Sequence, residues 1–156
     1  MGRVVTMEDI KEKLYLLCLN FIKQRIHTAE TALEQAREAS NDDTKSSAGD
    51  KFETTREMMQ QDISRNKRLL MDAQQNLALL NSIKEMPLND KVRNGNLVYT
   101  SEGIFYIGIS AGQLKLENEI IFAISAASPI GNLLIGKEKD MFFDFNKRKY
   151  VIKKII

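Results

Sequence analysis

No glycine or proline occurs between Lys51 and Met86, and this uninterrupted stretch constrains the fold more than any other feature of the chain. Apolar residues recur along it at heptad-like spacing, with the polar Asn66 on the same stripe. The stripe comprises Phe52, Met59, Ile63, Leu70, Ala73, Leu77 and Leu80. We predict one helix from about Asp50 to Ile83, about 50 Å long at a rise of 1.5 Å per residue. Such a length fits one arm of an antiparallel hairpin better than an ordinary globular helix.

The N-terminal part of the chain supplies a second helix of the right length. Thr6 can cap its start, and the acidic Glu8 and Asp9 favour the positive end of the helix dipole. Its apolar stripe shifts register once, between Phe21 and Ile22. The residues are Ile10, Leu14, Leu17 and Phe21, then Ile22, Ile26, Ala29, Leu33 and Ala36. The two stripes can bury each other, which predicts an antiparallel coiled-coil hairpin.

A short, polar and acidic stretch, residues 41–53, separates the two helical patterns and is expected to form the tip of the hairpin. Four carboxylates lie in it, on Asp42, Asp43, Asp50 and Glu53. Hard cations such as Mg²⁺ take oxygen ligands and keep several waters, so exposed carboxylates can complete a shared metal site. The alternative is a solvated loop that caps the second helix, with Ser47 or Asp50 near its start.

The chain changes character after a linker at residues 86–90, where Pro87 disfavours helix at the preceding residue. We therefore divide it into a helical hairpin, residues 1–85, and a β-rich domain, residues 86–156. A short helix begins at Ser128-Pro129 and stops at Gly136. Strands are predicted at residues 97–100, 104–109, 120–124, 141–145 and 150–152, with 120–124 a buried strand. The fold class is α+β, with a small antiparallel sheet carrying one helix.

Composition excludes several classes of protein. The net charge of +2 is too small to indicate bulk nucleic-acid binding, and the single cysteine, Cys18, permits no internal disulfide. No apolar run approaches a membrane span, and Met1–Asp9 has no signal-peptide core, so a soluble cytoplasmic protein is expected. Cys18 is predicted to be a core residue, and His27 a helix-surface residue. No catalytic triad or glycine-rich phosphate loop is present, which argues against a stand-alone enzyme.

A basic cluster, Arg65, Lys67 and Arg68, lies on the second helix. Such a patch can contact a phosphate backbone. The alternative is a solvated charged face that keeps the hairpin soluble.

One segment resembles a known family. SPIGNLLIGKE, residues 128–138, resembles a segment of the C-terminal domain of the bacterial Gre transcript-cleavage factors. The strands expected at 141–145 and 150–155 are similar to those that follow in the family. Residues 34–38 and then 43–45 look like its helix end and acidic loop. With the hairpin and proline linker, the resemblance covers nearly the whole chain.

The resemblance implies a function in transcription. The β domain, similar to FK506-binding proteins (FKBP-like), would dock at the rim of the secondary channel of RNA polymerase, and Ser128, Pro129, Ile130, Gly136 and Lys137 would belong to this docking domain. The hairpin would enter the channel and reach the 3′ end of the nascent RNA. The family is not expected to bind a membrane or to recognise DNA sequence directly.

At the tip, the resemblance implies a role for the carboxylates. They would help to hold an Mg²⁺ ion shared with the polymerase active site, so that backtracked RNA is cut by the polymerase's own chemistry. Asp43 is the first candidate ligand, Asp42 the second, and Asp50 and Glu53 supplement them.

The chain departs from the family at this tip. Three residues after Asp43 the family has Glu, whereas this chain has Ser46, and the loop is about two residues longer, with Gly49-Asp50 added before Phe52. Two alternatives therefore stay open: a cleavage-inactive regulator or inhibitor that occupies the secondary channel, and a coiled-coil adaptor unrelated to polymerase.

Overall fold

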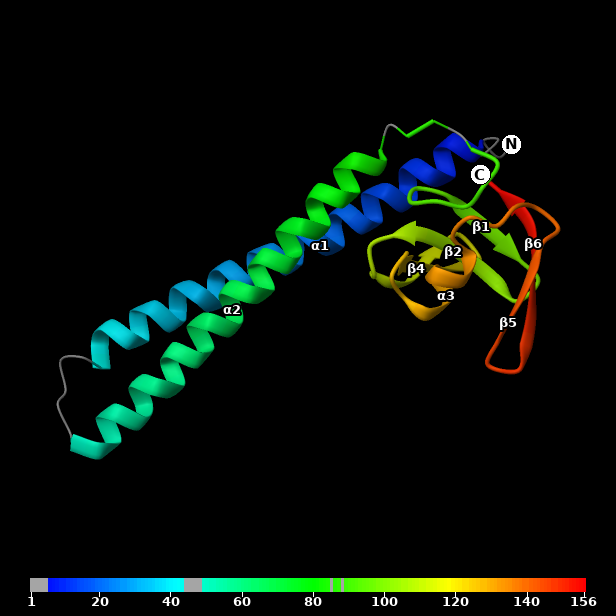
Figure 1. Ribbon diagram of the computed structural model, residues 1–156. Coiled ribbons are helices and arrows are strands. Elements are labelled where there is room, and N and C mark those ends of the chain that lie inside the picture. The colour runs from blue at the N-terminus through cyan, green and yellow to red at the C-terminus, as the bar shows by residue number, and fades with distance from the viewer. Residues whose placement is uncertain (1–5, 44–48, 85, 88) are drawn as a thin grey trace. The chain divides into compact units, whose positions relative to one another are not determined.

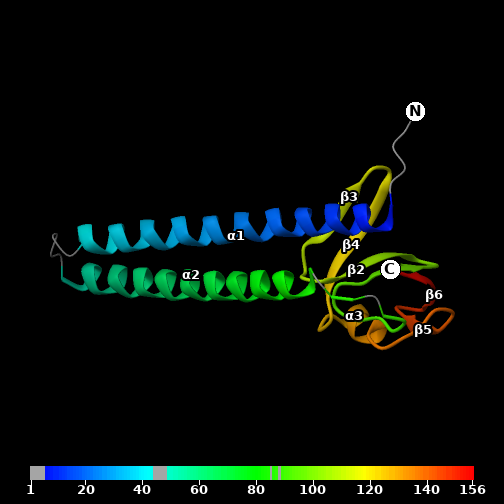
Figure 2. The same cartoon turned by 90° about the horizontal axis from the view of Figure 1, so that it is seen from above.

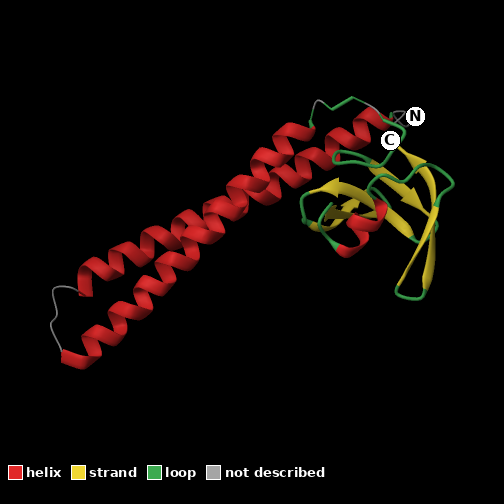
Figure 3. Ribbon diagram, viewed as in Figure 1, coloured by secondary structure: helices red, strands yellow, loops and turns green. Residues whose placement is uncertain are grey.

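The computed structural model describes residues 6–43, 49–84, 86–87 and 89–156, apart from the side chains of residues 7 and 40–53. The chain divides into two compact units, Ile22–Leu77 and Met1–Phe21 with Ala78–Ile156. It is an α+β protein with two long helices followed by a six-stranded sheet (Figure 3). None of its described helices is long and apolar enough to cross a membrane.

Helix α1 spans Met7–Asp43 and helix α2 spans Gly49–Ile83. The predicted bounds of α2 are confirmed to within one residue, and α1 continues to Asp43, three residues into the stretch 41–53 that was predicted to form the tip. The start of α1 is capped as expected, because the Thr6 hydroxyl accepts a hydrogen bond of 3.2 Å from the backbone N–H of Asp9. The Asp9 carboxylate accepts one of 3.4 Å from the backbone N–H of Thr6 in return, which completes a reciprocal cap.

Within the unit Ile22–Leu77 the two helices lie side by side and run in opposite directions (Figures 1 and 2). Their buried residues form one narrow line on each helix: Ile22, Ala29 and Leu33 on α1, and Ile63, Asn66 and Ala73 on α2. These six positions belong to the predicted stripes and confirm them there. The Phe52 side chain lies outside the described residues, and the other stripe members in this unit are half-buried: Ile26, Ala36, Met59, Leu70 and Leu77.

The first part of α1 buries a different stripe from the predicted one. Leu14, Cys18 and Ile22 are fully buried, whereas Leu17 is 37 % exposed. A spacing of four residues keeps Leu14, Cys18 and Ile22 on one helical face, and Leu17 lies off that face. Cys18 is therefore a core residue, as predicted, and the placement of Leu17 in the core was wrong.

The sheet is formed by β1 (Leu97–Thr100), β2 (Gly103–Gly108), β3 (Gly112–Leu116), β4 (Glu119–Ser125), β5 (Phe142–Phe145) and β6 (Arg148–Ile155). Its strand order is β3-β4-β2-β1-β6-β5. The short helix α3, Pro129–Leu134, connects β4 to the β5–β6 hairpin (Figure 1).

The sheet is mixed, so the prediction of an antiparallel sheet was wrong in one pair. Strands β2 and β4 run parallel, from Ile104 paired with Ile121 to Gly108 paired with Ser125. The reason is strand β3, which was not predicted. It follows β2 in the chain and pairs antiparallel with β4, and β4 lies between β3 and β2 in the sheet, so β4 runs in the same direction as β2. The prediction that β4 is buried throughout was also wrong, because Ile120 is 53 % exposed while Ile121 and Ala123 are buried.

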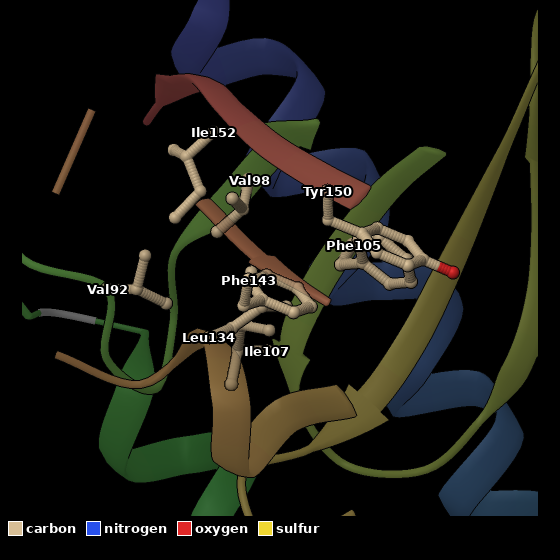
Figure 4. Packing of buried hydrophobic residues seen from close by; sticks show 8 residues of the cluster. All are labelled: Val92, Val98, Phe105, Ile107, Leu134, Phe143, Tyr150 and Ile152. Carbon is tan, nitrogen blue, oxygen red and sulfur yellow. The ribbon is translucent and has the colours of Figure 1, made fainter. Parts of the chain in front are cut away.

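The core of the β region gathers residues from strands, loop and α3 around several aromatic rings (Figure 4). The rings of Phe143 and Tyr150 stack with centroids 5.0 Å apart, and Phe105 lies 6.3 Å from Tyr150. The buried cluster comprises Val92, Val98, Phe105, Ile107, Leu134, Phe143, Tyr150 and Ile152.

Candidate functional site

The predicted metal-binding carboxylates are distributed over two helix ends. Asp42 and Asp43 belong to the last turn of α1, and Asp50 and Glu53 to the beginning of α2. Residues 44–48, which include Ser46, are not among the described residues, and neither are the four acidic side chains. The structure therefore establishes the helical setting of these acids and leaves their role as ligands a prediction.

The helix ends give the two pairs of acids different electrostatic settings. A carboxylate at a helix N-terminus is stabilised by the helix dipole, whereas one in the last turn is disfavoured by about 0.3–1 kcal/mol. The last turn of α1 holds Asp42 and Asp43 and no basic residue. Among the side chains that the structure describes, which do not include the four tip acids, no group of three His, Cys, Asp or Glu residues is placed to hold a metal.

The basic cluster on α2 is brought together only in part. Arg65 and Arg68 line a shallow surface depression of about 430 Å³ with Gln60, Gln61 and Ser64, and Lys67 is not part of its lining. Arg65 also forms an exposed ion pair of 3.2 Å with Asp62. Two cations thus share one face of α2, and one of them is already paired.

The segment 128–137, which carries the family resemblance, has clear structural duties at its N-terminal end. Ser128 caps α3: its hydroxyl accepts a hydrogen bond of 3.1 Å from the backbone N–H of Gly131 and donates one of 2.7 Å to the carbonyl of Ser125. Pro129 occupies the first position of α3, where its missing N–H costs nothing. Ile130 packs against the aromatic core. A Cβ atom at Gly131 would collide with the Ser125 carbonyl, so only glycine fits there.

The C-terminal end of the segment is hydrogen-bonded to Val92, which follows the linker in the chain. Gly136 has a φ of +84°, which favours glycine, and its N–H donates a hydrogen bond of 2.8 Å to the carbonyl of Val92. The carbonyl of Lys137 accepts one of 2.9 Å from Val92 in return. The Lys137 ammonium lies 5.8 Å from the centre of the Phe143 ring. These contacts explain, by their role in folding, why most of the residue types in the segment 128–137 are required.

Three exposed apolar side chains were not singled out from the sequence: Ile135 within this segment, and Met141 and Phe142 just after it. Phe142 is 56 % exposed, and its ring lies 4.2 Å from the Lys149 ammonium. The alternation of strand β5 is the signal that could have found it, since Phe142 must face away from the side that buries Phe143. An exposed aromatic ring of this kind is a better indicator of an interaction site than the residues that cap α3 and form its turns.

The remaining predictions for reactive side chains agree with the structure. Burial raises the pKa of the Cys18 thiol to about 12, so Cys18 is not a poised nucleophile. His27 is exposed on α1, as expected for a surface histidine.

Comparisons of the chain with models of protein families, with curated proteins and with solved structures found no match.

Proposed function

We propose that the chain is a Gre-like transcription elongation factor, an accessory protein that supports cleavage of backtracked RNA by RNA polymerase. The observation that carries the proposal is a pair of antiparallel helices, of 37 and 35 residues, with acidic residues at both of the ends they present to the loop. The sequence resemblance of residues 128–138 and the β region that follows the helices support it. A polymerase partner also implies a cytoplasmic location.

In this proposal the helices form a coiled coil that enters the secondary channel. At 1.5 Å per residue each helix measures about 50 Å, and two helices side by side are roughly 20 Å wide. Long helices with one narrow buried line each are suited to a slender arm, because little apolar surface has to be covered.

Asp43 and Asp42, supplemented by Asp50 and Glu53, would hold an Mg²⁺ ion shared with the polymerase active site. When bound, the ion supplies stabilisation of the negative charge that develops on a phosphodiester under attack by water. The carboxylates themselves would orient that water as hydrogen-bond acceptors. Arg65 and Arg68 would lie close to nucleic acid phosphates, with Lys67 contributing only long-range charge.

The β region would act as an FKBP-like docking domain. Ser128 and Pro129 are engaged in starting α3, and Gly136 and Lys137 in hydrogen bonds to Val92. We therefore assign the docking contact to the exposed Phe142, with Met141 and Ile135. Exposed aromatic side chains commonly dominate the energy of protein interfaces.

A second function keeps the fold and drops the cleavage activity. Ser46 follows Asp43 by three residues, where the family has Glu, so the tip has one carboxylate fewer at that position. A chain that binds the channel without completing the metal site would act as a regulator or inhibitor of polymerase.

The test is RNA cleavage in stalled, backtracked polymerase complexes with Mg²⁺ present. We expect the wild-type chain to raise the cleavage rate at least about tenfold, and Asp42→Ala plus Asp43→Ala to abolish that increase. The matched control is Glu57→Ala plus Asp72→Ala, which removes the same charge from exposed positions of α2 and should leave the rate unchanged.

The other outcomes separate the alternatives. Binding to polymerase without any increase in cleavage would contradict the cleavage role and support the inactive regulator. Failure of the chain to co-purify with polymerase would contradict both and support a coiled-coil adaptor.

A further inference from the structure

A cavity of about 540 Å³ that the proposed function does not use is lined by the start of α1, the end of α2 with Met86, and three residues of the β region, Gly95, Tyr106 and Ile156. All of its lining residues belong to one compact unit, Met1–Phe21 with Ala78–Ile156. Its size falls within the range of about 300–1,000 Å³ that is typical of small-molecule sites.

The inner wall of the cavity is apolar. Ile83, Tyr106 and Ile156 line it and are each at most 5 % exposed, and the side chain of Met86 lines it nearer the surface. An apolar or aromatic body can therefore be buried against them, which removes its apolar surface from water.

One wall carries a positive charge that has no carboxylate partner. Lys11 lines the cavity and is half-buried, and no described carboxylate lies within the 4.0 Å of an ion pair with it. Burial, and then the nearby Arg93 guanidinium, lower the pKa of the Lys11 ammonium. An anion placed beside Lys11 would relieve both the lost hydration and the repulsion from Arg93.

Other charged groups also line the cavity. Glu8 and Glu12 line the cavity and are exposed, and the Lys84 ammonium lies 5.3 Å from the centre of the Tyr15 ring. The two positive charges of Lys11 and Lys84 equal in number the two negative charges of Glu8 and Glu12. Lys11 is therefore distinguished by its burial rather than by the net charge.

The hydroxyl of a buried tyrosine adds a second polar group. Tyr106 lines the cavity and is 3 % exposed, and its hydroxyl makes no hydrogen bond to any group that the structure describes. Tyr15, by contrast, donates a hydrogen bond of 3.0 Å to the side-chain carbonyl of Asn81. The Tyr106 hydroxyl oxygen is itself accessible to solvent, so it can donate a hydrogen bond to an acceptor oxygen of a ligand in the cavity.

We propose that this cavity binds a small organic anion, with an apolar or aromatic body against Ile83, Met86 and Ile156 and one carboxylate, sulfonate or phosphate group beside Lys11 and Tyr106. The proposal does not depend on the function of the hairpin tip. It assigns to the base of the helices a ligand site of its own.

A pair of fluorescent probes tests the body and the charge separately. One is 8-anilinonaphthalene-1-sulfonate, and the other is N-phenyl-1-naphthylamine, which has the same rings without the sulfonate. With the full chain we expect saturable binding of the sulfonate at one site. Lys11→Gln should weaken it about five- to tenfold, which corresponds to about 1–1.4 kcal/mol, and should leave the neutral probe unaffected.

Lys13→Gln is the matched control, because Lys13 is exposed two residues away and is not part of the cavity lining. It should change neither affinity. Tyr106→Phe should weaken sulfonate binding about threefold, and unchanged circular dichroism and melting temperature will show that each variant is folded. Absence of saturable binding, binding at several equivalent sites, or equal affinities for Lys11→Gln and Lys13→Gln would overturn the proposal.

Discussion

The hairpin unit, Ile22–Leu77, and the sheet bury their apolar residues in different ways. In the hairpin, the buried residues that the structure describes form a single line on each helix, two of them are alanines, and one of them is the polar Asn66. In the β region, the buried cluster is three-dimensional and includes the rings of Phe105, Phe143 and Tyr150. The hairpin is thus held together by two facing lines of buried residues, which we call the seam, and the sheet is held together by a three-dimensional core.

The difference follows from where the backbone hydrogen bonds are made. A helix satisfies its N–H and C=O groups within about four residues, so a long helix needs only a thin apolar seam to be held in place. A sheet pairs strands that are distant in sequence and must recover the cost of closing loops through dense packing. We therefore expect damage to the seam to stay within the hairpin and damage to the core to affect the whole sheet.

The largest effect is expected in the core. Phe105→Ala removes a ring that packs against Phe122 and Tyr150 with centroids 5.8 and 6.3 Å away, and should lower the free energy of unfolding of the sheet by about 3–5 kcal/mol. Chemical denaturation followed by circular dichroism measures the loss. Phe142→Ala is the control, since that ring is 56 % exposed and its loss should cost less than about 0.5 kcal/mol. Similar losses for the two variants would contradict the assignment of the core.

The next effect tests whether the seam is independent of the core. Ile63→Ala truncates a residue that is 9 % exposed and should destabilise the hairpin by about 2–3 kcal/mol. Hydrogen exchange read by mass spectrometry should show faster exchange in Ile22–Leu77 and no change in strands β1–β6. Met58→Ala, at a position 62 % exposed, should leave exchange unaltered. Faster exchange in the sheet of the Ile63 variant would show that the two units unfold together.

A smaller effect concerns the cap of α3. Ser128→Ala removes both the acceptor for the Gly131 N–H and the donor to the Ser125 carbonyl, and should cost about 1 kcal/mol. The melting temperature of the sheet is a suitable measurement, with the exposed Ser110→Ala as the matched serine variant. If both variants melt alike, the role of the resemblance segment in capping α3 is wrong.

The smallest effect should have the opposite sign. Asn66 is 9 % exposed on the seam, and no hydrogen bond joins its side chain to a described group. Asn66→Leu should raise the stability of the hairpin by about 0.5–1 kcal/mol, because a polar seam residue specifies register at a cost in stability. Size-exclusion chromatography should also reveal some self-association, which the exposed variant Gln75→Leu should lack. A destabilised, strictly monomeric Asn66→Leu protein would contradict this view of the seam.

The two regions also differ in how much the sequence predicted. The bounds of α2 were predicted to within one residue because helical periodicity is local, and α3 was predicted from Ser128, Pro129 and Gly136. The parallel pairing of β2 with β4 was missed, because it depends on β3, whose five residues include one buried side chain, Leu114. The sequence of one strand contains little information about which distant strand it pairs with.

For the candidate sites, residue types were easier to predict than arrangement. The helical setting of Asp42 and Asp43 follows from the length of α1, which continues three residues into the stretch 41–53 that was predicted to separate the two helices. The division of the basic cluster, with Arg65 and Arg68 together and Lys67 apart, reflects the angular spacing of a helix. The cavity beside Lys11 joins residues from both ends of the chain, and no single stretch of sequence contains its pattern.

We propose that the tip acts in RNA cleavage while the β region provides the contact that binds polymerase. The most direct test is to measure the rate of RNA cleavage in backtracked polymerase complexes as a function of factor concentration. We predict that Asp42→Asn plus Asp43→Asn lowers the maximal rate at least about tenfold without changing the half-saturating concentration, and that Phe142→Ala raises that concentration without changing the maximal rate. Tip and Phe142 variants that both match the wild type would contradict the account.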